Sequence, residues 1–446
     1  MTSTVHATTY QDLAGRFAPA LQDIARGEPA REAGRHLPFA ALEQLRAVGI
    51  GTLTVPVEAG GSGAGQEDML RLLMDLAAVD ANTAHLVRSH LSFVEHVLAQ
   101  PDEALRTRWL ERVADGELAG SALSEARGPA LGEMDTTVSR DEGGQLRISG
   151  RKYYTTGSIF ATWTLATARL DDAVPLPGRR RGGSRQNLAS GAPGGSPGSA
   201  RLALAVVRVR QPRTLVKDDW DGFGQRLTGT GTVEFDRAGV EELLALPPAD
   251  GHVPLHHEAT LMALLAGVGR AALRDGVDQT KRRRRSPNTA GGLTPREDDQ
   301  LLGIIGELSA QQATAEELVR AAGRDLDAAL ALAAAGRDTQ GGRAAVGADA
   351  GDDGGDDGAA AEALQRAALT AHRAHVMVPR LVLDTCTRIF DTLGASATST
   401  ELQLDRHWRN ARTLASHDPA VFMARMVGDW EVNGTAPVPY LSTGTA

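Results

Sequence analysis

The hydrophobic pattern changes its period twice along the chain, and this change constrains the fold more than any other feature. Residues up to about 115 and from about 255 onward carry apolar side chains at spacings of three and four, which indicates amphipathic helices. Between about 118 and 248 the segments are short, β-rich and separated by Gly or Asp turns, which indicates strands. The sequence therefore predicts an N-terminal α-helical domain, a central β-barrel and a C-terminal four-helix bundle.

We place the domain boundaries at these changes, which gives residues 1–117, 118–248 and 249–446. A chain of 446 residues exceeds what one hydrophobic core usually supports, so more than one domain is expected. Two low-complexity stretches interrupt the plan. Residues 178–199 are rich in Gly, Ser, Pro and Arg, and residues 338–358 are rich in Gly and Asp, so we predict a disordered insertion and a solvated loop.

The composition argues against several classes of protein. The net charge of −9 argues against nucleic acid as the main partner. No apolar run approaches the roughly 20 residues that span a bilayer, and the start of the sequence lacks the pattern of a secretory signal. The single cysteine, Cys386, lies in an apolar helical stretch, so we predict core packing and a reducing cytoplasm.

The histidines raise the question of a metal site. His85, His90 and His96 share one expected helix, but spacings of five and six residues do not place them on one face. The stretch HVPLHH (252–257) contains a proline and lacks a fourth ligand at a useful spacing, so we expect a loop there. The sequence therefore predicts no metal.

Four segments carry a resemblance to a known fold: ALSEA (122–126), GRKYYTTGSIFATW (150–163), DDWDGFGQRLTGTGTVEFD (218–236) and DRHWRNARTLASHDP (405–419). With helical, β and helical domains in this order, the chain resembles the acyl-CoA dehydrogenase fold over essentially its whole length apart from the two insertions. Within that fold, the last three segments resemble the flavin-dependent monooxygenases of the dibenzothiophene monooxygenase-like branch. Any one of them alone would be a weak signal.

The resemblance implies a two-component monooxygenase. A separate flavin reductase supplies reduced FMN, and dioxygen then reacts through a flavin hydroperoxide to oxygenate a small organic substrate, for example one that contains sulfur or nitrogen. Subunits that share each flavin site would form a homotetramer. Two alternatives stay open: an acyl-CoA dehydrogenase that uses FAD, and a flavin-fold binding protein without catalytic activity.

The end of the expected helix 405–415 bears on this choice. A dehydrogenase needs a carboxylate base, and Asp418 could take that place, but it is shorter than the usual Glu and Pro419 restricts the turn. A histidine with an ordinary pKa near 6.5 can donate or relay a proton at neutral pH. We therefore predict that His417 is catalytic and faces the flavin; the alternative is a histidine that only terminates the helix.

The other site candidates rest on the resemblance. We expect Ser158 to hydrogen-bond the flavin, because the preceding Gly157 permits close approach of the backbone, and His90 to line the substrate pocket. Ser124 stands where the fold has a Thr that binds the flavin pyrimidine edge. Ser121 stands where sulfur-oxidising relatives have Asn, which puts their substrate in doubt for this chain. The remaining expected flavin contacts are Tyr154, Thr156, Trp220 and, for the phosphate of a neighbouring subunit, Arg283 with Arg285 as second choice. Core packing is the alternative for Trp220, and a satisfied buried side chain is the alternative for His90.

Overall fold

The computed structural model describes residues 8–125, 134–177, 201–248, 250–286, 290–346 and 354–437, without the side chains of 336–346 and 354–357. The predicted insertion at 178–199 lies outside these residues. Within the described part of the chain, no helix has the length and apolar character needed to cross a membrane.

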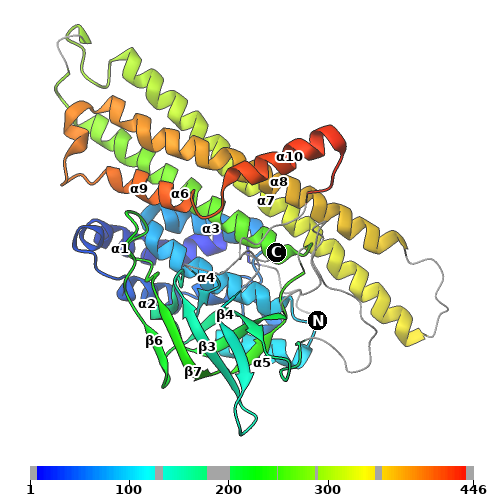
Figure 1. Cartoon of the computed structure of the whole chain (residues 1–446). Coiled ribbons are helices and arrows are strands. Elements are labelled where there is room, and N and C mark those ends of the chain that lie inside the picture. The colour runs from blue at the N-terminus through cyan, green and yellow to red at the C-terminus, as the bar shows by residue number, and fades with distance from the viewer. Residues whose placement is uncertain are drawn as a thin grey trace.

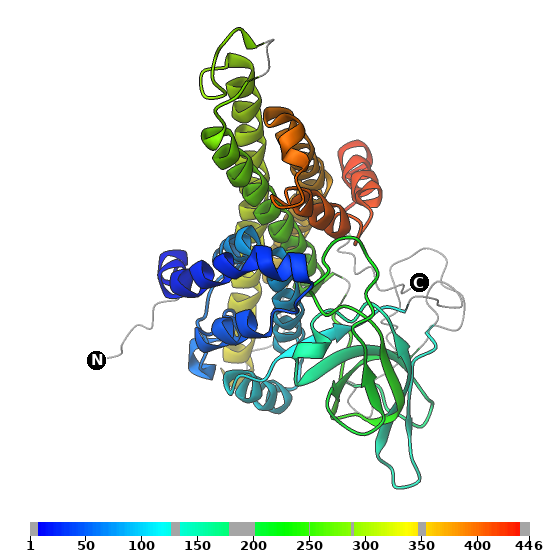
Figure 2. The same ribbon diagram turned by 90° about the vertical axis from the view of Figure 1, so that its left-hand side faces the viewer.

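The described chain is arranged in three layers. Figure 1 shows the long C-terminal helices packed on one side of the N-terminal helices, with the sheet on the other side. In the perpendicular view of Figure 2 the sheet curls on itself beneath the helices. The predicted order of helical, β and helical segments is confirmed.

The N-terminal layer is built around one buried helix. Its members are α1 (Tyr10–Gly34), α2 (Phe39–Ala47), α3 (Gln66–Val79), α4 (Ala81–Leu98) and α5 (Glu103–Ala114), with short turns η1 (Ile50–Thr52) and η2 (Val57–Ala59). The side chain of Asp80 caps α4 by accepting a hydrogen bond from the backbone N–H of Thr83 (2.9 Å). Leu86 and Leu91 of α4 belong to the core shared with the bundle, whereas Phe93 and Val97 belong to the core shared with the sheet. α4 therefore reaches all three layers.

The sheet contains eight described strands: β1 (Ala119–Ala122), β2 (Thr137–Arg140), β3 (Leu146–Lys152), β4 (Trp163–Leu170), β5 (Leu202–Arg208), β6 (Thr214–Val216), β7 (Val233–Gly239) and β8 (Glu242–Leu244). The strand order is β6-β7-β3-β2-β4-β5-β8, and β1 pairs in parallel with β4. The register of β3 on β7 shifts between Ile148 and Gly150, where φ is +145° and a Cβ would lie 2.6 Å from the Cα of Thr136. The predicted barrel corresponds to this curled sheet, and a third core fills its interior.

The C-terminal layer contains α6 (His252–Arg282), α7 (Asp299–Val346), α8 (Gly354–Arg388), α9 (Asp405–Leu414) and α10 (Ala420–Asn433), with turns η5 (Ile389–Thr392) and η6 (Gly394–Thr398). The expectation of a loop at 252–257 is wrong, because α6 begins at His252. Pro254 is tolerated there because the first N–H groups of a helix have no intrahelical partner. Helix also occupies parts of the predicted insertion at 338–358, since α7 extends to Val346 and α8 begins at Gly354. Residues 347–353 between them lie outside the description.

The single cysteine lies in the bundle core. Cys386 of α8 is fully buried among apolar neighbours, and burial raises the pKa of its thiol to about 12. The prediction of core packing for Cys386 is therefore confirmed.

Candidate functional site

The turn between α9 and α10 places His417 beside His85 of α4. Its backbone N–H donates to the carbonyl of Leu414 (3.1 Å), and its side chain is 43% exposed. Nδ1 of His417 lies 3.0 Å from a carboxylate oxygen of Asp418, which only accepts when ionised, so Nδ1 carries a hydrogen. Nε2 makes no hydrogen bond to the described residues. It remains available for proton transfer.

A buried histidine of α8 holds this turn from behind. Nδ1 of His375 lies 3.0 Å from a carboxylate oxygen of Glu258, and its Nε2 lies 3.1 Å from the backbone carbonyl of Asp418. Both partners accept hydrogen bonds, so both ring nitrogens carry hydrogens and His375 is an imidazolium. The same carboxylate of Glu258 accepts from Nδ1 of His372 at 3.0 Å. A buried ion pair therefore fixes the backbone next to His417.

The charge state of His375 follows from this pairing. Burial opposes the charged ring, but the hydrogen bond and the negative charge of Glu258 together raise its pKa above the ordinary value. Burial likewise opposes the charged Glu258, whose pKa is lowered because His372 and His375 donate to it. A raised histidine pKa contributes stability that is complete below the ordinary pKa and is lost as the pH rises through the raised value.

His85 of α4 faces His417 across the site. The two ring centroids are 6.4 Å apart with an edge-to-face arrangement. Nδ1 of His85 donates to the side-chain oxygen of Gln225 (3.0 Å). Burial, followed by the nearby charge of Arg88, lowers the pKa of His85 well below its ordinary value. His85 is therefore a neutral imidazole whose Nε2 can accept a proton.

Gln225 has a strained backbone. Its φ is +54°, in the left-handed region that non-glycine residues seldom occupy, and its N–H donates to the side-chain oxygen of Asn410 on α9 (2.7 Å). The buried Nε2 of Gln225 has no hydrogen-bond partner among the described residues. Strain and an unpaired buried donor both cost free energy, and such costs are concentrated at functional sites.

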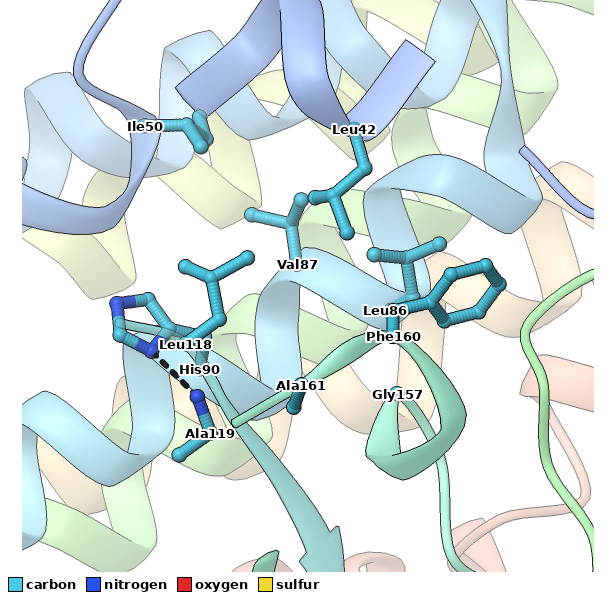
Figure 3. Close-up of a pocket in the computed structure, with 10 residues that line it drawn as sticks. All are labelled: Leu42, Ile50, Leu86, Val87, His90, Leu118, Ala119, Gly157, Phe160 and Ala161. Carbon is cyan, nitrogen blue, oxygen red and sulfur yellow. Dashed lines mark hydrogen bonds between the residues drawn. The ribbon is translucent and has the colours of Figure 1, made fainter. Parts of the chain in front are cut away.

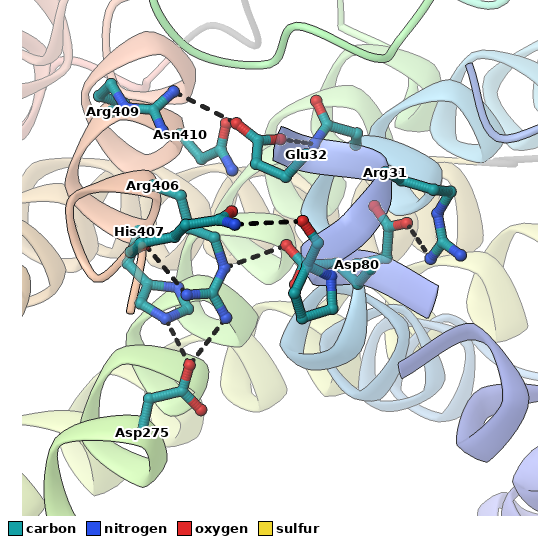
Figure 4. A network of polar contacts seen from close by, with 12 residues as sticks. Arg31, Glu32, Asp80, Asp275, Arg406, His407, Arg409 and Asn410 are labelled. Atoms are coloured by element: carbon teal, nitrogen blue, oxygen red, sulfur yellow. Dashed lines mark hydrogen bonds and ion pairs between the residues drawn. The ribbon is translucent and has the colours of Figure 1, made fainter. Parts of the chain in front are cut away.

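A network of ion pairs holds α9 in place, as Figure 4 shows. Arg406 and His407 both donate to one carboxylate oxygen of Asp275 on α6, at 2.8 and 2.9 Å. Arg409 pairs with the buried Glu32 of α1 at 3.2 Å. Because α9 leads directly into the His417 turn, the network sets the position of that turn relative to α4.

Most predicted flavin contacts come together beside this site. The backbone N–H of Ser121 on β1 donates to the carbonyl of Thr156 (3.0 Å), and the N–H of Tyr153 donates to the carbonyl of Ser124 (3.4 Å). The loop that carries Ser124 is anchored by Glu125, which accepts from the fully buried Lys152 (2.9 Å). The hydroxyl of Ser121 lies 3.5 Å from that of Ser89, one turn after His85 on α4, so this segment borders the site.

An aromatic cluster forms the next part of this edge. The ring of Trp220 lies 6.0 Å from Tyr153 and 6.2 Å from Tyr154, which is 48% exposed. The indole N–H of Trp220 donates to the carbonyl of Gly224 (3.0 Å). The hydroxyl group of Thr156 bonds that of Thr230 at 2.8 Å. Trp220 is thus held in a partly exposed position rather than in the core.

The acidic residues around Trp220 explain why this stretch keeps its shape. Asp218 forms a two-point ion pair with Arg35, the residue that follows α1, at 2.9 and 3.0 Å. The carboxylate of Asp219 accepts from the backbone N–H of Thr232 (2.7 Å), and Asp221 accepts from the hydroxyl of Tyr153 (2.8 Å). Each acidic residue fixes a different side of the segment.

The hydroxyl of Ser158 contacts protein rather than an open site. Ser158 is fully buried at the start of η3 (Ser158–Phe160), where it donates to the carbonyl of Ser121 (3.2 Å) and bonds Thr164 (2.8 Å). The expected hydrogen bond from Ser158 to a flavin therefore lacks support in this arrangement. The preceding Gly157 has φ of +79°, and a Cβ there would lie 3.1 Å from the carbonyl of Leu86, so close packing against α4 requires glycine.

His90 lies five residues after His85 on α4, so its side chain leaves the helix on a different face. Its Nε2 donates to the carbonyl of Gly51 (3.0 Å), and its Nδ1 accepts from the N–H of Ala119 (3.1 Å). Figure 3 shows His90 beside a small apolar pocket, whose volume of about 10 Å³ leaves room for roughly one water molecule. Burial lowers the pKa of His90 to about 4. The expected substrate-pocket role of His90 is not supported, because both ring nitrogens are used and the pocket is small.

Arg283 lies away from this cluster. It follows the C-terminus of α6, a helix whose 31 residues extend over about 45 Å, and its guanidinium donates to the carbonyl of Thr392 (3.3 Å). Within one chain the structure does not bring Arg283 to the other predicted flavin contacts. Its expected role concerned a neighbouring subunit and stays a prediction.

Comparisons with known proteins give the same fold. Residues 9–117 match the acyl-CoA dehydrogenase N-terminal domain family. A probable FMNH2-dependent monooxygenase, SfnC of Pseudomonas putida, is 28% identical and the match covers 96% of this chain and 95% of SfnC. The dibenzothiophene monooxygenase of Mycolicibacterium goodii is 27% identical over 89% of this chain and 88% of that enzyme. The structure of methanesulfinate monooxygenase MsuC from Pseudomonas fluorescens superposes with a TM-score of 0.78 at 25% identity, covering 96% of this chain and 98% of MsuC.

The chain is a homologue of flavin-dependent monooxygenases with the acyl-CoA dehydrogenase fold. This confirms the fold and the resemblance that the sequence motifs predicted. The matches cover nearly all of this chain and nearly all of SfnC and MsuC, so the similarity is not confined to one segment.

Several residues of the site in this chain were not predicted from the sequence. Gln225 and Asn410 stood within two of the quoted motifs, but nothing in the sequence shows that they meet. His372 and His375 are three residues apart, a spacing that places both on one helix face and is a sequence signal for a shared partner. Their partner Glu258 is 114 residues from His372, and only the packing of α6 against α8 joins them.

Proposed function

We propose that this chain is a flavin-dependent monooxygenase that receives reduced FMN from a separate flavin reductase. The arrangement of His417 carries the proposal: Asp418 orients its Nδ1, and its Nε2 stays available beside the neutral His85. In a dehydrogenase of this fold a carboxylate removes the substrate proton, whereas here the Asp418 carboxylate accepts a hydrogen bond from His417. The site is therefore better suited to protonation by a histidine.

The residues around Gln225 fit a flavin. The buried and unpaired Nε2 of Gln225 is a hydrogen-bond donor that needs an acceptor, and flavin rings carry several acceptors. We propose that the flavin is held by Ser121, Ser124, Tyr154, Thr156 and Trp220. FMN is the favoured flavin because the relative SfnC is a probable FMNH2-dependent monooxygenase, and FAD is the alternative. When bound, reduced FMN supplies the electrons that activate dioxygen.

The protein then contributes binding, proton transfer and exclusion of water. His417 donates a proton from Nε2, and Asp418 orients the ring by accepting from Nδ1. His85 accepts or returns a proton at its own Nε2. The ion pair of Glu258 and His375 keeps the turn rigid while the site is in use.

The function is tested with the purified chain, chemically reduced FMN and ¹⁸O₂. We expect one ¹⁸O atom in the product of a small sulfur- or nitrogen-containing substrate, and no product when the chain is omitted. A parallel reaction supplies FAD, an acyl-CoA and a dye acceptor. Dye reduction without incorporation of ¹⁸O would replace the proposal with the dehydrogenase alternative.

We also propose a homotetramer in which Arg283 reaches the flavin phosphate of a neighbouring subunit. Exposed apolar side chains on α10, among them Val421 (69%), Phe422 (54%) and Val432 (80%), support burial of this helix in an assembly. We expect sedimentation at micromolar concentration to show a tetramer, and Phe422→Glu to shift it toward smaller species. A wild-type chain that sediments only as a monomer would contradict the proposal.

A further inference from the structure

A polar stripe of α4 meets a polar stripe of α6 inside the molecule. Arg88, Ser92 and His96 follow one another at four-residue spacing on α4, so they share one face. Thr260 accepts a hydrogen bond from Arg88 (3.1 Å), and the ring of His257 lies 5.3 Å from that of His96. We call this contact between α4 and α6 the α4–α6 seam.

Arg88 is a buried cation without a close carboxylate. It is only 7% exposed, and its two protein hydrogen bonds go to the neutral oxygens of Thr260 and of the His257 backbone (3.0 Å). None of the ion pairs among the described residues, taken to 4.0 Å, includes Arg88. Burial lowers the pKa of its guanidinium to about 10, against the influence of Asp418 farther away, so it stays charged at neutral pH. A buried charge is costly unless an opposite charge meets it.

Other groups along the seam also lack partners. The hydroxyl of Ser92 and Nε2 of His257 are buried and make no hydrogen bond to described residues. Both can donate a hydrogen bond. Burial lowers the pKa values of His256 and His257, and the charge of Arg88 is one of the smaller causes, so these rings are neutral. Arg88 is therefore a buried cation of the seam, and two unpaired donors lie on the residues one turn along α4 and at the contacted position of α6.

A large cavity lies at the other end of the seam. It has a volume of about 770 Å³, within the usual range for small-molecule sites, and Glu95 of α4 and His252 of α6 line it. Glu95 is committed to protein partners, since it lies 3.2 Å from both His252 and the side-chain nitrogen of Gln66. Burial opposes its charge, but the hydrogen bond from His252, with smaller contributions from neighbouring groups, lowers its pKa to about 2. The other acid that lines the cavity, Asp327, accepts from the backbone N–H groups of Gln66 and Glu67 (2.6 and 3.0 Å). The cavity thus adjoins the seam, and both acids in its wall are hydrogen-bonded to protein.

We propose that the α4–α6 seam binds the acid group of a small organic anion, with Arg88 as its charge partner and Ser92 and His257 as hydrogen-bond donors. The class comprises sulfinates, sulfonates and carboxylates, whose oxygens match a guanidinium. The identification of this anion as the substrate to be oxygenated rests on the proposed function, whereas the anion site itself does not. Arg88 lies one helical turn after His85, so an acid group bound there would place the rest of a small molecule next to His85 and His417.

Calorimetry with the flavin-free chain tests the site. Methanesulfonate is the anionic probe, dimethyl sulfone is its neutral counterpart, and methylammonium is the cationic one. We expect methanesulfonate to bind best and Arg88→Gln to weaken its binding about 10- to 100-fold, as expected when a charged hydrogen bond is lost. Arg88→Lys should restore part of the affinity. Ser92→Ala should cause a smaller loss.

Arg270→Gln is the matched control, because Arg270 of α6 is already paired with Asp75 and Glu316 (2.6 and 2.8 Å). We expect unchanged binding of methanesulfonate in this variant. Equal binding of the neutral probe, tighter binding of methylammonium, no binding to the wild-type chain, or no effect of Arg88→Gln would each overturn the inference. Binding that depends on Arg88 in a chain that fails to incorporate ¹⁸O would reject the proposed function and keep the anion site.

Discussion

Replacement of His417 by alanine should reduce the rate of oxygenation about 10²–10⁴-fold, the usual effect of losing a general acid. The fold should survive, because the side chain is partly exposed and, among the described residues, its only hydrogen bond goes to its neighbour Asp418. Binding of reduced FMN should change little, since the proposed flavin contacts lie on other segments. Without the proton donor, more of the reduced flavin should be consumed as hydrogen peroxide. The ratio of product to peroxide measures this directly.

Two companion variants sharpen the result. His36→Ala removes an exposed histidine at the end of α1 and should leave both rate and product ratio at wild-type values. Asp418→Asn keeps an oxygen that can accept from Nδ1 of His417, so a mild effect is expected from a monooxygenase. A severe loss in Asp418→Asn with a normal His417→Ala would instead identify Asp418 as the base of a dehydrogenase.

Glu258→Ala should destabilise the protein by about 3–5 kcal/mol, because it leaves the imidazolium of His375 buried without its counter-charge. The contribution of this pair is complete below the ordinary histidine pKa and is lost as the pH rises through the raised value. The difference from wild type should therefore be larger at about pH 6 than at about pH 9. Denaturant unfolding followed by circular dichroism at both pH values measures it.

Glu316→Ala serves as the control for this measurement. Glu316 also forms an ion pair, with Arg270, but both side chains are partly exposed (26% and 32%), so a loss of about 0–1 kcal/mol is expected. Glu258→Gln retains the size of the side chain and should fall between the two. Equal losses in Glu258→Ala and Glu316→Ala would show that His375 is not charged in the folded protein.

The helical and β segments were predictable because each depends on local chemistry. Ala84, Val87 and Leu91 follow one another at three- and four-residue spacing, so a helix buries all three on one face, wherever that helix packs. The turn that carries His417 and Asp418 was predictable from the adjacent Pro419, and the burial of Cys386 was predictable from its apolar neighbours in sequence. Local patterns failed at HVPLHH, because a proline in the first turn of a helix resembles a proline in a loop.

The functional contacts depend on residues that are distant in sequence, and only the packing of the layers brings these together. Gln225 meets Asn410 across 185 positions, and Glu258 meets His375 across 117. Ionisation depends on the same packing: the sequence shows many histidines, but burial keeps His85 neutral whereas Glu258 keeps His375 charged. The sequence by itself therefore determined the segments, their order and the turn that carries His417. The tertiary structure decided which side chains pair and which stay unpaired, because burial and pairing depend on contacts between separate elements.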